Sequence, residues 1–356
     1  MKILDLKLAK IDRLTADSVK LSFDTQLMPE FAYQAGQYVT LCFNIKGEEV
    51  RRAYSICSTP GDQHLSVAVK EVKHGLVSTH INRSVMPGEH IRVMVPQGHF
   101  TFSPDASKER HIVLFGAGSG ITPLISILKT TLAQEPNSRV TLFYGNRRKD
   151  SIMFYDELES LGTNPNVNIY HILSEDSGQQ PLFAGRINFG KTLELVYNFA
   201  NDSLEKTYYI CGPGEMMIST KDALIDSGVD AKSVRMEYFE NPDLKGKASE
   251  PIAVTAPAPV PSNGMSEVHV HLDGNDYTFN LATKGKTLLE AAISNGADAP
   301  FSCRGGVCTT CRAQIKEGTV SMDSNLSLTD DEIEEGYILT CQSHPTSAVV
   351  RISYDD

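Results

Sequence analysis

Four of the seven cysteines lie close together near the end of the chain, at a spacing that suits a metal centre. Cys303, Cys308 and Cys311 form a C-x4-C-x2-C run, and Cys341 follows thirty positions later. The small residues between the first ligands allow a compact loop whose backbone amides can point at sulfur, and the fourth ligand can come from a distant strand. This spacing is typical of the cysteines that bind a 2Fe-2S cluster.

Two other centres could use cysteines of this kind. Four thiolates can hold zinc tetrahedrally, but zinc sites usually pair their cysteines as two short knuckles, and this sequence has one such pair. A Rieske centre is disfavoured because no C-x-H pair accompanies these residues. Chance burial of the four cysteines is the remaining alternative. Seven cysteines suit no disulfide framework, so we expect a reducing compartment and a cytoplasmic location.

Two segments in the first hundred residues could bind a flavin nucleotide. Arg52-Ala53-Tyr54-Ser55 lies on an expected strand, and the segment from Gly75 to Thr79 lies at an expected turn into a helix. An arginine can neutralise a pyrophosphate, a tyrosine can pack on an isoalloxazine, a serine can hydrogen-bond at N5, and a helix start can bind phosphate. Taken alone, each segment is better explained without a ligand, the first as a surface arginine on an edge strand and the second as an ordinary helix N-cap.

Two later segments could bind a second nucleotide. Gly116-Ala117-Gly118-Ser119-Gly120-Ile121-Thr122-Pro123 follows an apolar run and opens a helix, so its backbone could approach a pyrophosphate, although it departs from the G-x-G-x-x-G fingerprint. The run 209–214 ends another expected strand, where ligands of open α/β sheets gather. As an alternative, Cys211 is a small buried residue before a turn. A further segment, Glu237-Tyr238-Phe239, is explained by ordinary packing at a strand end when it is taken alone.

The elements that must position these residues change character along the chain. Short expected strands with Gly or Pro turns between them predict a small antiparallel barrel; they are residues 9–14, 18–23, 37–44, 52–57, 64–72 and 90–96. Expected strands at 112–115, 140–144, 168–173 and 208–211, with a helix at 123–132, predict a parallel α/β sheet. A hairpin across 273–276 and capping boxes at Thr287 and Thr329 indicate an α+β unit at the end of the chain.

We therefore predict three domains of different fold class. They are a flavin-binding antiparallel β-barrel at 1–105, an α/β nucleotide domain with a parallel sheet at 106–244, and an α+β β-grasp-like domain at 266–356. Between the last two, residues 245–265 include a Pro- and Ala-rich stretch that cannot build a core, and we interpret it as a tether.

Charge and hydropathy exclude several classes of function. The formal net charge is -11, and residues 266–356 hold fourteen Asp and Glu against six Lys and Arg. An acidic surface repels phosphate backbones, so nucleic acid is disfavoured as a ligand and a basic protein is a better partner; solubility alone is the simpler explanation of the charge. No run of eighteen apolar residues suggests a membrane span, and the first residues lack the basic-then-apolar order of a secretory signal.

Residues 266–356 resemble a plant-type ferredoxin domain over their whole length. The resemblance implies that Cys303, Cys308, Cys311 and Cys341 are the four ligands of a 2Fe-2S cluster. It also implies that Arg304, Gly305 and Gly306 surround the cluster.

Residues 1 to about 244, with the segments above in this order, resemble the ferredoxin-NADP reductase superfamily. The resemblance implies FAD-binding residues Arg52, Tyr54, Ser55, Gly75, Ser78 and Thr79, the last three at the pyrophosphate. It implies NAD(P)H-binding residues Gly116, Gly118, Gly120, Thr122, Cys211, Gly212 and Pro213, the last three beside the nicotinamide. The residues at the reacting rings would be Ser55, Cys211, Glu237 and Phe239. Phe239 departs from the terminal tyrosine of plant reductases, which leaves its stacking role open. Cys42 and Cys57 match no functional position and are expected in the core.

The whole chain resembles the reductase components of oxygenases, that of phenylacetyl-CoA epoxidase among them. The implied electron route is NAD(P)H to FAD to the 2Fe-2S cluster, because nicotinamide delivers two electrons and the cluster accepts one. FMN in place of FAD stays open. So does the nicotinamide: Ser174-Glu175-Asp176 favours NADH, whereas Arg147-Arg148 could bind the 2′-phosphate of NADPH or form a solvated basic turn.

The sequence has no H-E-x-x-H motif, no evident two-His-one-carboxylate cluster and no pair of E-x-x-H motifs, so we expect the electron acceptor to be another protein. The resemblance points to a di-iron epoxidase or hydroxylase that acts on an acyl-CoA. The acidic charge of residues 266–356 separately predicts that a basic patch of this acceptor docks on the ferredoxin domain. A fatty-acyl desaturase, a ring-hydroxylating dioxygenase and a hybrid-cluster protein are alternative acceptors. A redox-sensing regulatory subunit and an electron-transfer module fed by a separate dehydrogenase are the alternative functions.

Overall fold

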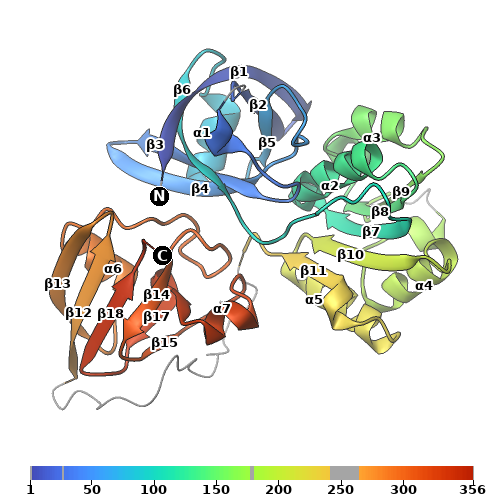
Figure 1. Ribbon diagram of the computed structural model, residues 1–356. Coiled ribbons are helices and arrows are strands. Elements are labelled where there is room, and N and C mark those ends of the chain that lie inside the picture. Colours follow the sequence, from blue (N-terminus) through green and yellow to red (C-terminus); the bar gives the residue numbers. More distant parts are fainter. Residues whose placement is uncertain (1, 26–27, 177–179, 241–263, 356) are drawn as a thin grey trace. The chain divides into compact units, whose positions relative to one another are not determined.

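The computed structural model describes residues 2–25, 28–176, 180–240 and 264–355 (Figure 1). The chain divides into two compact units, one spanning Lys2–Phe239 and one spanning Glu240–Asp356. The predicted barrel and nucleotide domain lie in the first unit and the predicted ferredoxin domain in the second. The predicted tether falls almost entirely on residues outside those described, and the predicted domain limits stay predictions.

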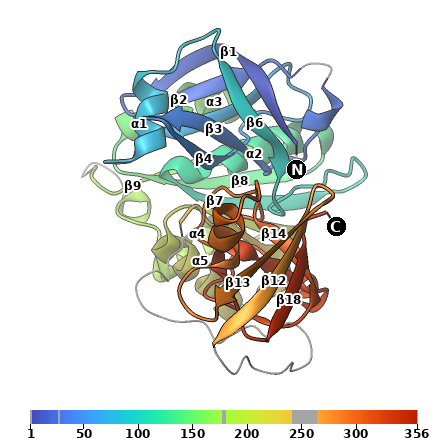
Figure 2. The same cartoon turned by 90° about the vertical axis from the view of Figure 1, so that its left-hand side faces the viewer.

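The first part of the Lys2–Phe239 unit is an antiparallel sheet in the strand order β4-β3-β6-β1-β2-β5 (Figures 1 and 2). An antiparallel bridge between Ile56 and Val67 joins the two ends, so the sheet closes as the predicted barrel. Every second residue of a strand points inward, as with Val39, Leu41 and Phe43, which are buried in the barrel core. The bounds are β1 (Ile3–Thr15), β2 (Ser18–Phe23), β3 (Tyr38–Ile45), β4 (Glu48–Ser55), β5 (Leu65–Lys70), β6 (His90–Gln97) and α1 (Leu76–Arg83).

The first strand is longer than the sequence predicts. We expect a strand at 9–14, but β1 begins at Ile3 because Leu6 and Leu8 continue the alternation and are fully buried. Asp5 and Lys7, which alternate with these two leucines, are exposed, and their charges hide the pattern.

The second part of the unit is the predicted parallel sheet, in the order β11-β10-β7-β8-β9. Helices α2 and α3 pack on one face, with residues such as Leu124 and Leu158, and helices α4 and α5 pack on the other, with Leu195 and Met217. The strands are β7 (Arg110–Ala117), β8 (Arg139–Asn146), β9 (Val167–Leu173), β10 (Glu205–Cys211) and β11 (Val234–Glu237), and the helices are α2 (Ile121–Gln134), α3 (Tyr155–Leu161), α4 (Phe189–Phe199) and α5 (Gly214–Asp226).

The barrel and the parallel sheet share a core. Phe100 and Phe102 of the barrel side lie in the same apolar cluster as the α2 residues, and Phe100 packs edge-on against Tyr209 of β10. The Tyr209 hydroxyl donates to the Thr101 carbonyl at 3.2 Å. These contacts fix the two sheets as one body, which is what two nucleotides held side by side require.

The Glu240–Asp356 unit contains a mixed sheet in the order β13-β12-β18-β14-β16, in which only β12 and β18 run parallel (Figure 2). A second ladder joins β15 and β17. The bounds are β12 (Met265–Leu272), β13 (Asn275–Ala282), α6 (Leu288–Ser294), β14 (Arg312–Glu317), β15 (Val320–Met322), α7 (Asp330–Glu334), β16 (Tyr337–Leu339), β17 (Ser343–Pro345) and β18 (Val349–Ser353). This is the predicted β-grasp-like arrangement, and both predicted capping boxes are present, at Thr287 and Thr329.

The predicted hairpin is tighter than expected. The loop has two residues, Asp273 and Gly274, instead of the predicted four, and both have positive φ, +48° and +74°. That geometry belongs to a type I′ turn, whose twist matches the flanking strands.

Short 3-10 helices complete the elements, at Pro29–Phe31, Gly118–Gly120, Lys149–Ser151, Pro181–Phe183, Ala231–Ser233 and Thr340–Gln342. Among the residues that the structure describes, no helix combines the length and the apolar character that a membrane crossing needs.

Candidate cofactor sites

Three predicted site residues lie side by side at the carboxyl ends of neighbouring strands. Gly116 of β7 pairs with Cys211 of β10, which in turn pairs with Glu237 of β11. The carboxyl edge of a parallel sheet is where nucleotides bind in open α/β folds. The structure therefore brings together segments that are about 120 residues apart in the sequence.

Gly120 and Cys211 touch through their backbones. A Cβ atom at Gly120 would overlap the carbonyl group of Cys211 and would stand 2.8 Å from the amide nitrogen of Gly212. Gly212 has little more room, because a Cβ there would lie 3.2 Å from the amide nitrogen of Ala117. Only glycine permits this approach, so the two predicted nicotinamide segments form one surface.

The glycine loop is held by Tyr144, which the sequence did not single out, and by Thr122, which it did. Gly118 has a φ of +55°, and its carbonyl accepts a hydrogen bond from the Tyr144 hydroxyl at 2.8 Å. The Thr122 hydroxyl is buried and donates to the Ser119 carbonyl at 3.0 Å, so it supports the loop from within. Helix α2 begins directly after this loop, and α5 begins directly after Pro213. The free amides of two helix starts therefore face the same edge, which favours a diphosphate there.

Burial favours the uncharged forms of Cys211 and Glu237. Cys211 is fully buried, and burial, with a smaller effect of the Glu237 carboxylate, raises the pKa of its thiol. Desolvation raises the pKa of Glu237 to about 8. A carboxyl that keeps its proton at pH 7 can donate a hydrogen bond, which a carboxylate cannot. Phe239, two residues further on, is 38% exposed.

The predicted flavin residues of the barrel lie on β4. Arg52 is exposed, and its Nη1 donates to the carbonyl of Arg51 at 2.7 Å. Tyr54 packs against the barrel core, and burial raises the pKa of its hydroxyl. Ser55, the last residue of the strand, is buried. The strand thus presents a cation, an aromatic ring and a hydroxyl in sequence.

Helix α1 begins where the sequence predicts, with Gly75 as its N-cap. A Cβ at Gly75 would lie 2.5 Å from the Ser78 hydroxyl, which accepts a hydrogen bond from the amide of Val72 at 3.1 Å. The Thr79 hydroxyl donates to Glu71 at 3.4 Å. Since both hydroxyls support the turn, the backbone amides of the first helical turn are the groups best placed to meet an anion.

The four predicted cluster cysteines converge as two close pairs. The sulfur atoms of Cys303 and Cys308 are 3.1 Å apart. Hydrogen bonding between the thiols of Cys311 and Cys341 lowers the pKa of Cys341 and raises that of Cys311. The negative charge of Cys303 has a smaller, opposite effect and raises the pKa of Cys341. Two pairs of thiols suit two irons with two cysteines each. Within the described residues, no three His, Cys, Asp or Glu side chains gather in the geometry of a single metal ion.

The surroundings of the thiols fit an anionic cluster. The Cys308 thiol and backbone amides, including that of Gly305 at 3.3 Å, hydrogen-bond to the Cys303 sulfur and lower its pKa to about 6. The hydroxyl of Ser302, directly before Cys303, is buried and has no hydrogen-bond partner among the described residues. A buried donor without a partner costs about 1–3 kcal/mol, so a cluster sulfur is a fitting acceptor for it.

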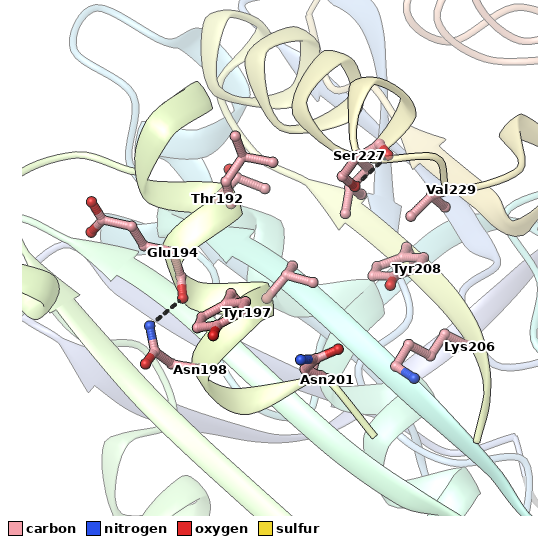
Figure 3. A pocket seen from close by; sticks show the side chains of 13 residues that line it. Thr192, Glu194, Tyr197, Asn198, Asn201, Lys206, Tyr208, Ser227 and Val229 are labelled. Atoms are coloured by element: carbon pink, nitrogen blue, oxygen red, sulfur yellow. Dashed lines mark hydrogen bonds between the residues drawn. The ribbon is translucent and has the colours of Figure 1, made fainter. Parts of the chain in front are cut away.

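A pocket of about 640 Å³ lies away from these sites, between α4, the start of β10 and the end of α5 (Figure 3). Tyr197, Lys206 and Tyr208 line it, and Lys206 is held by Asp202 at 2.9 Å. The pocket lies toward the amino end of β10, opposite the glycine loop. It therefore contributes nothing to the nucleotide site.

Comparison with known proteins places the three parts in known families. Residues 5–102 match the oxidoreductase FAD-binding domain, residues 114–222 the oxidoreductase NAD-binding domain, and residues 270–346 the 2Fe-2S iron-sulfur cluster binding domain. The FAD, NAD and 2Fe-2S cofactors expected from the sequence are thus confirmed at the level of domains.

Relatives with the same three parts are similar over nearly the whole chain. The chain is 36% identical to a component of 1,2-phenylacetyl-CoA epoxidase from Escherichia coli (strain K12), covering 98% of this chain and 97% of that protein. It is 32% identical to the ferredoxin reductase component of 3-ketosteroid-9-alpha-monooxygenase from Mycobacterium tuberculosis (strain CDC 1551 / Oshkosh), covering 99% and 96%. The solved structure of phthalate dioxygenase reductase shares the fold, with a TM-score of 0.58 and 21% identity over 99% of this chain and 98% of that one.

Proposed function

Because this chain belongs to the family of reductase components that join FAD-binding, NAD-binding and 2Fe-2S domains, we propose that it supplies electrons to the oxygenase component of a multicomponent system. It is an NAD(P)H-dependent oxidoreductase. The observation that carries the proposal is the 36% identity over 98% of the chain to a component of an epoxidase, together with the three domains in one chain.

The residues of the first unit have separate tasks in this proposal. Arg52 and the first amides of α1 bind the FAD pyrophosphate, and Tyr54 and Ser55 contact the flavin ring. The loop from Gly116 to Thr122 binds the NAD(P)H diphosphate, and Cys211 with Gly212 and Pro213 forms the wall beside the nicotinamide. Glu237 offers its proton and Phe239 its ring at the flavin. FAD, once bound, supplies the chemistry that converts a two-electron hydride donor into single electrons.

The proposed acceptor is a di-iron epoxidase or hydroxylase acting on an acyl-CoA, by analogy with the phenylacetyl-CoA epoxidase relative. The steroid and glycine betaine monooxygenase reductases among the relatives make other oxygenases the second candidates. A cytoplasmic location is part of the proposal, since NAD(P)H and reduced thiolates are both needed.

The acidic ferredoxin domain is proposed to dock on a basic patch of that acceptor. We expect reduction of cytochrome c and of the captured partner to slow as salt rises from low concentration to about 0.5 M, where the Debye length falls to roughly 4 Å. Asp331→Asn with Glu334→Gln should weaken the salt dependence. Both residues are exposed on α7 and lie outside the capping box formed by Thr329 and Glu332.

Steady-state rates across a salt series measure the effect, with menadione as an uncharged acceptor that should show little change. The partner itself is obtained by pull-down from cell extract, followed by NAD(P)H-driven turnover. A salt-independent rate with the partner would remove the docking proposal, and a captured acceptor without an oxygenase metal site would remove the oxygenase proposal.

The structure brings both candidate determinants of nicotinamide choice together. The Glu175 carboxylate lies 3.9 Å from Nε of Arg147 and 4.0 Å from Nη1 of Arg148. The Glu175 amide also donates to the Arg147 carbonyl at 2.9 Å. A carboxylate that pairs with these cations repels a 2′-phosphate, so we propose NADH as the donor.

Replacing Glu175 with alanine should raise the ratio of kcat/KM for NADPH over NADH by about tenfold, because the carboxylate that faces both arginines is removed. Arg147 is then left to meet the 2′-phosphate, whereas Arg148 keeps its ion pair with Asp150 at 3.3 Å. Glu159→Ala is the control, since it removes another carboxylate of this domain, one that lies 3.7 Å from His171. Ferricyanide reduction with each nicotinamide gives the ratio. A wild-type preference for NADPH, or an unchanged ratio in Glu175→Ala, would contradict the assignment.

A further inference from the structure

Gln342, the residue after the fourth cysteine, makes contacts that none of the motifs predicts. Its side chain is 9% exposed. Its amide nitrogen donates to the carbonyl of Cys341 at 2.9 Å and to the carbonyl of Arg304 at 3.1 Å, and it lies 3.7 Å from the sulfur of Cys341. One buried amide therefore reaches both the cysteine loop and the fourth cysteine.

One of these two carbonyls, that of Arg304, belongs to a residue in an unusual backbone conformation. Arg304 has a φ of +52°, in the left-handed region that residues other than glycine seldom adopt. Such a conformation persists where the surroundings hold it. The hydrogen bond from Gln342 to the Arg304 carbonyl is one such restraint, and the Arg304 guanidinium, 4.1 Å above the ring of Phe301, is another.

The aliphatic part of Gln342 also fills space that the cysteine loop leaves open. Gly306 has a φ of +76°, and a Cβ there would lie 3.2 Å from Cγ of Gln342. The carbonyl of Gly306 accepts from the amide of Leu326 at 3.0 Å, and the carbonyl of Gln342 accepts from the amide of Asp323 at 2.8 Å. Gln342 thus lies where three segments meet: the cysteine loop, the fourth cysteine and residues 323–326.

We propose that Gln342 is a positioning residue that fixes Cys341 against the 303–311 loop, and that the N–H group directed at the Cys341 carbonyl is shared with the Cys341 sulfur, which raises the reduction potential of the cluster. The inference rests on the proposed binding of the cluster by the four cysteines. Reduction adds one electron and no proton or bond, so the reduced cluster is more negative, and a donor to its sulfur ligands stabilises it more than the oxidised form.

The test compares full-length holoprotein variants by redox titration monitored by electron paramagnetic resonance. Gln342→Met keeps the length and the aliphatic Cβ and Cγ atoms of the side chain but removes the amide with both of its N–H groups. We expect its cluster potential to fall by an amount that makes reduction about fivefold less favourable, which is about 40 mV for one electron. Its EPR g values should also shift.

Gln314→Met is the matched control. The side-chain amide of Gln314, a residue of β14, also donates to a backbone carbonyl, that of Glu335, at 2.9 Å. This hydrogen bond does not involve a cysteine. This variant should keep the wild-type potential and g values, so that loss of a hydrogen bond alone does not account for the shift.

Two outcomes would overturn the inference. One is a Gln342→Met protein that binds the cluster with wild-type potential and g values. If that variant fails to retain the cluster, Gln342→Leu is titrated instead, because leucine is also uncharged and has no side-chain N–H group. An unchanged potential in Gln342→Leu is the second outcome. Wild-type protein without any iron-sulfur cluster would instead refute the proposed ligand set. Failure of the Gln342 inference can therefore be distinguished from failure of the proposed cluster binding.

Discussion

Replacing Cys341 with serine is expected to deprive the chain of its cluster while leaving the flavin half intact. Wild-type protein should contain about two irons and about two acid-labile sulfides per chain. Cys341 is the proposed ligand from outside the 303–311 loop, so its loss would leave one iron with a single thiolate. We expect reduction of cytochrome c by NADH to fall by more than about a hundredfold, whereas reduction of ferricyanide, which can take electrons from the flavin, should persist.

Two further variants make this result specific. Cys57→Ser is the matched control, because Cys57 is buried in the first unit and its Sγ donates to the carbonyl of Ser66 at 3.3 Å, a bond that a hydroxyl can also make. It should keep iron, sulfide and flavin. Arg52→Ala is the converse: it should lose FAD and keep the cluster, because the ferredoxin part lies in a separate compact unit.

Iron and sulfide analysis of anaerobically purified protein decides the matter. Zinc in place of iron in the wild-type protein would contradict the ligand assignment, and so would a Cys341→Ser protein with full iron and sulfide content. Loss of flavin and cluster together in Arg52→Ala would contradict the independence of the two units.

The spacing of cysteines was the most informative feature of the sequence for a physical reason. Cluster ligands must reach a rigid group within a short loop, so their separations are fixed and survive in the linear sequence. Period-two alternation and apolar runs likewise predicted the antiparallel barrel and the parallel sheet, because burial of one strand face or both faces leaves a direct record in residue types.

Contacts between segments that are distant in the sequence could not be predicted, because no local pattern of residue types indicates them. The sequence placed Gly120 and Cys211 in separate motifs, and only the pairing of β7 with β10 shows that their backbones touch. The support of Gly118 by Tyr144, and that of Arg304 by Gln342, depends equally on tertiary packing. Helices α3, α4 and α5 were also not predicted. Their apolar residues are divided between the sheet face and the exposed surface, where Tyr197 and Ile218 remain.

Gly120→Ala should abolish use of NADH without removing either cofactor. The added methyl group would overlap the carbonyl of Cys211, and β10 cannot yield easily because it pairs with β7 on one side and β11 on the other. The glycine loop would therefore have to move away from the sheet edge. Overpacking of this kind costs about 1–3 kcal/mol, and displacement of the diphosphate loop should lower kcat/KM for NADH by more than about a hundredfold.

Gly190→Ala is the control for this substitution, since Gly190 lies in the first turn of α4 and a Cβ there would meet no heavy atom nearer than Asn188 Oδ1 at 3.9 Å. Alanine is also the better helix former, so the free energy of unfolding should not decrease. Stopped-flow reduction of the flavin by NADH measures hydride transfer directly, and dithionite reduction shows that FAD and cluster remain competent. Because the clash lies between the two nicotinamide segments, normal flavin reduction by NADH in Gly120→Ala would mean that the nicotinamide binds elsewhere than at the β7 and β10 ends. Loss of FAD from Gly120→Ala would mean that this contact supports the barrel instead.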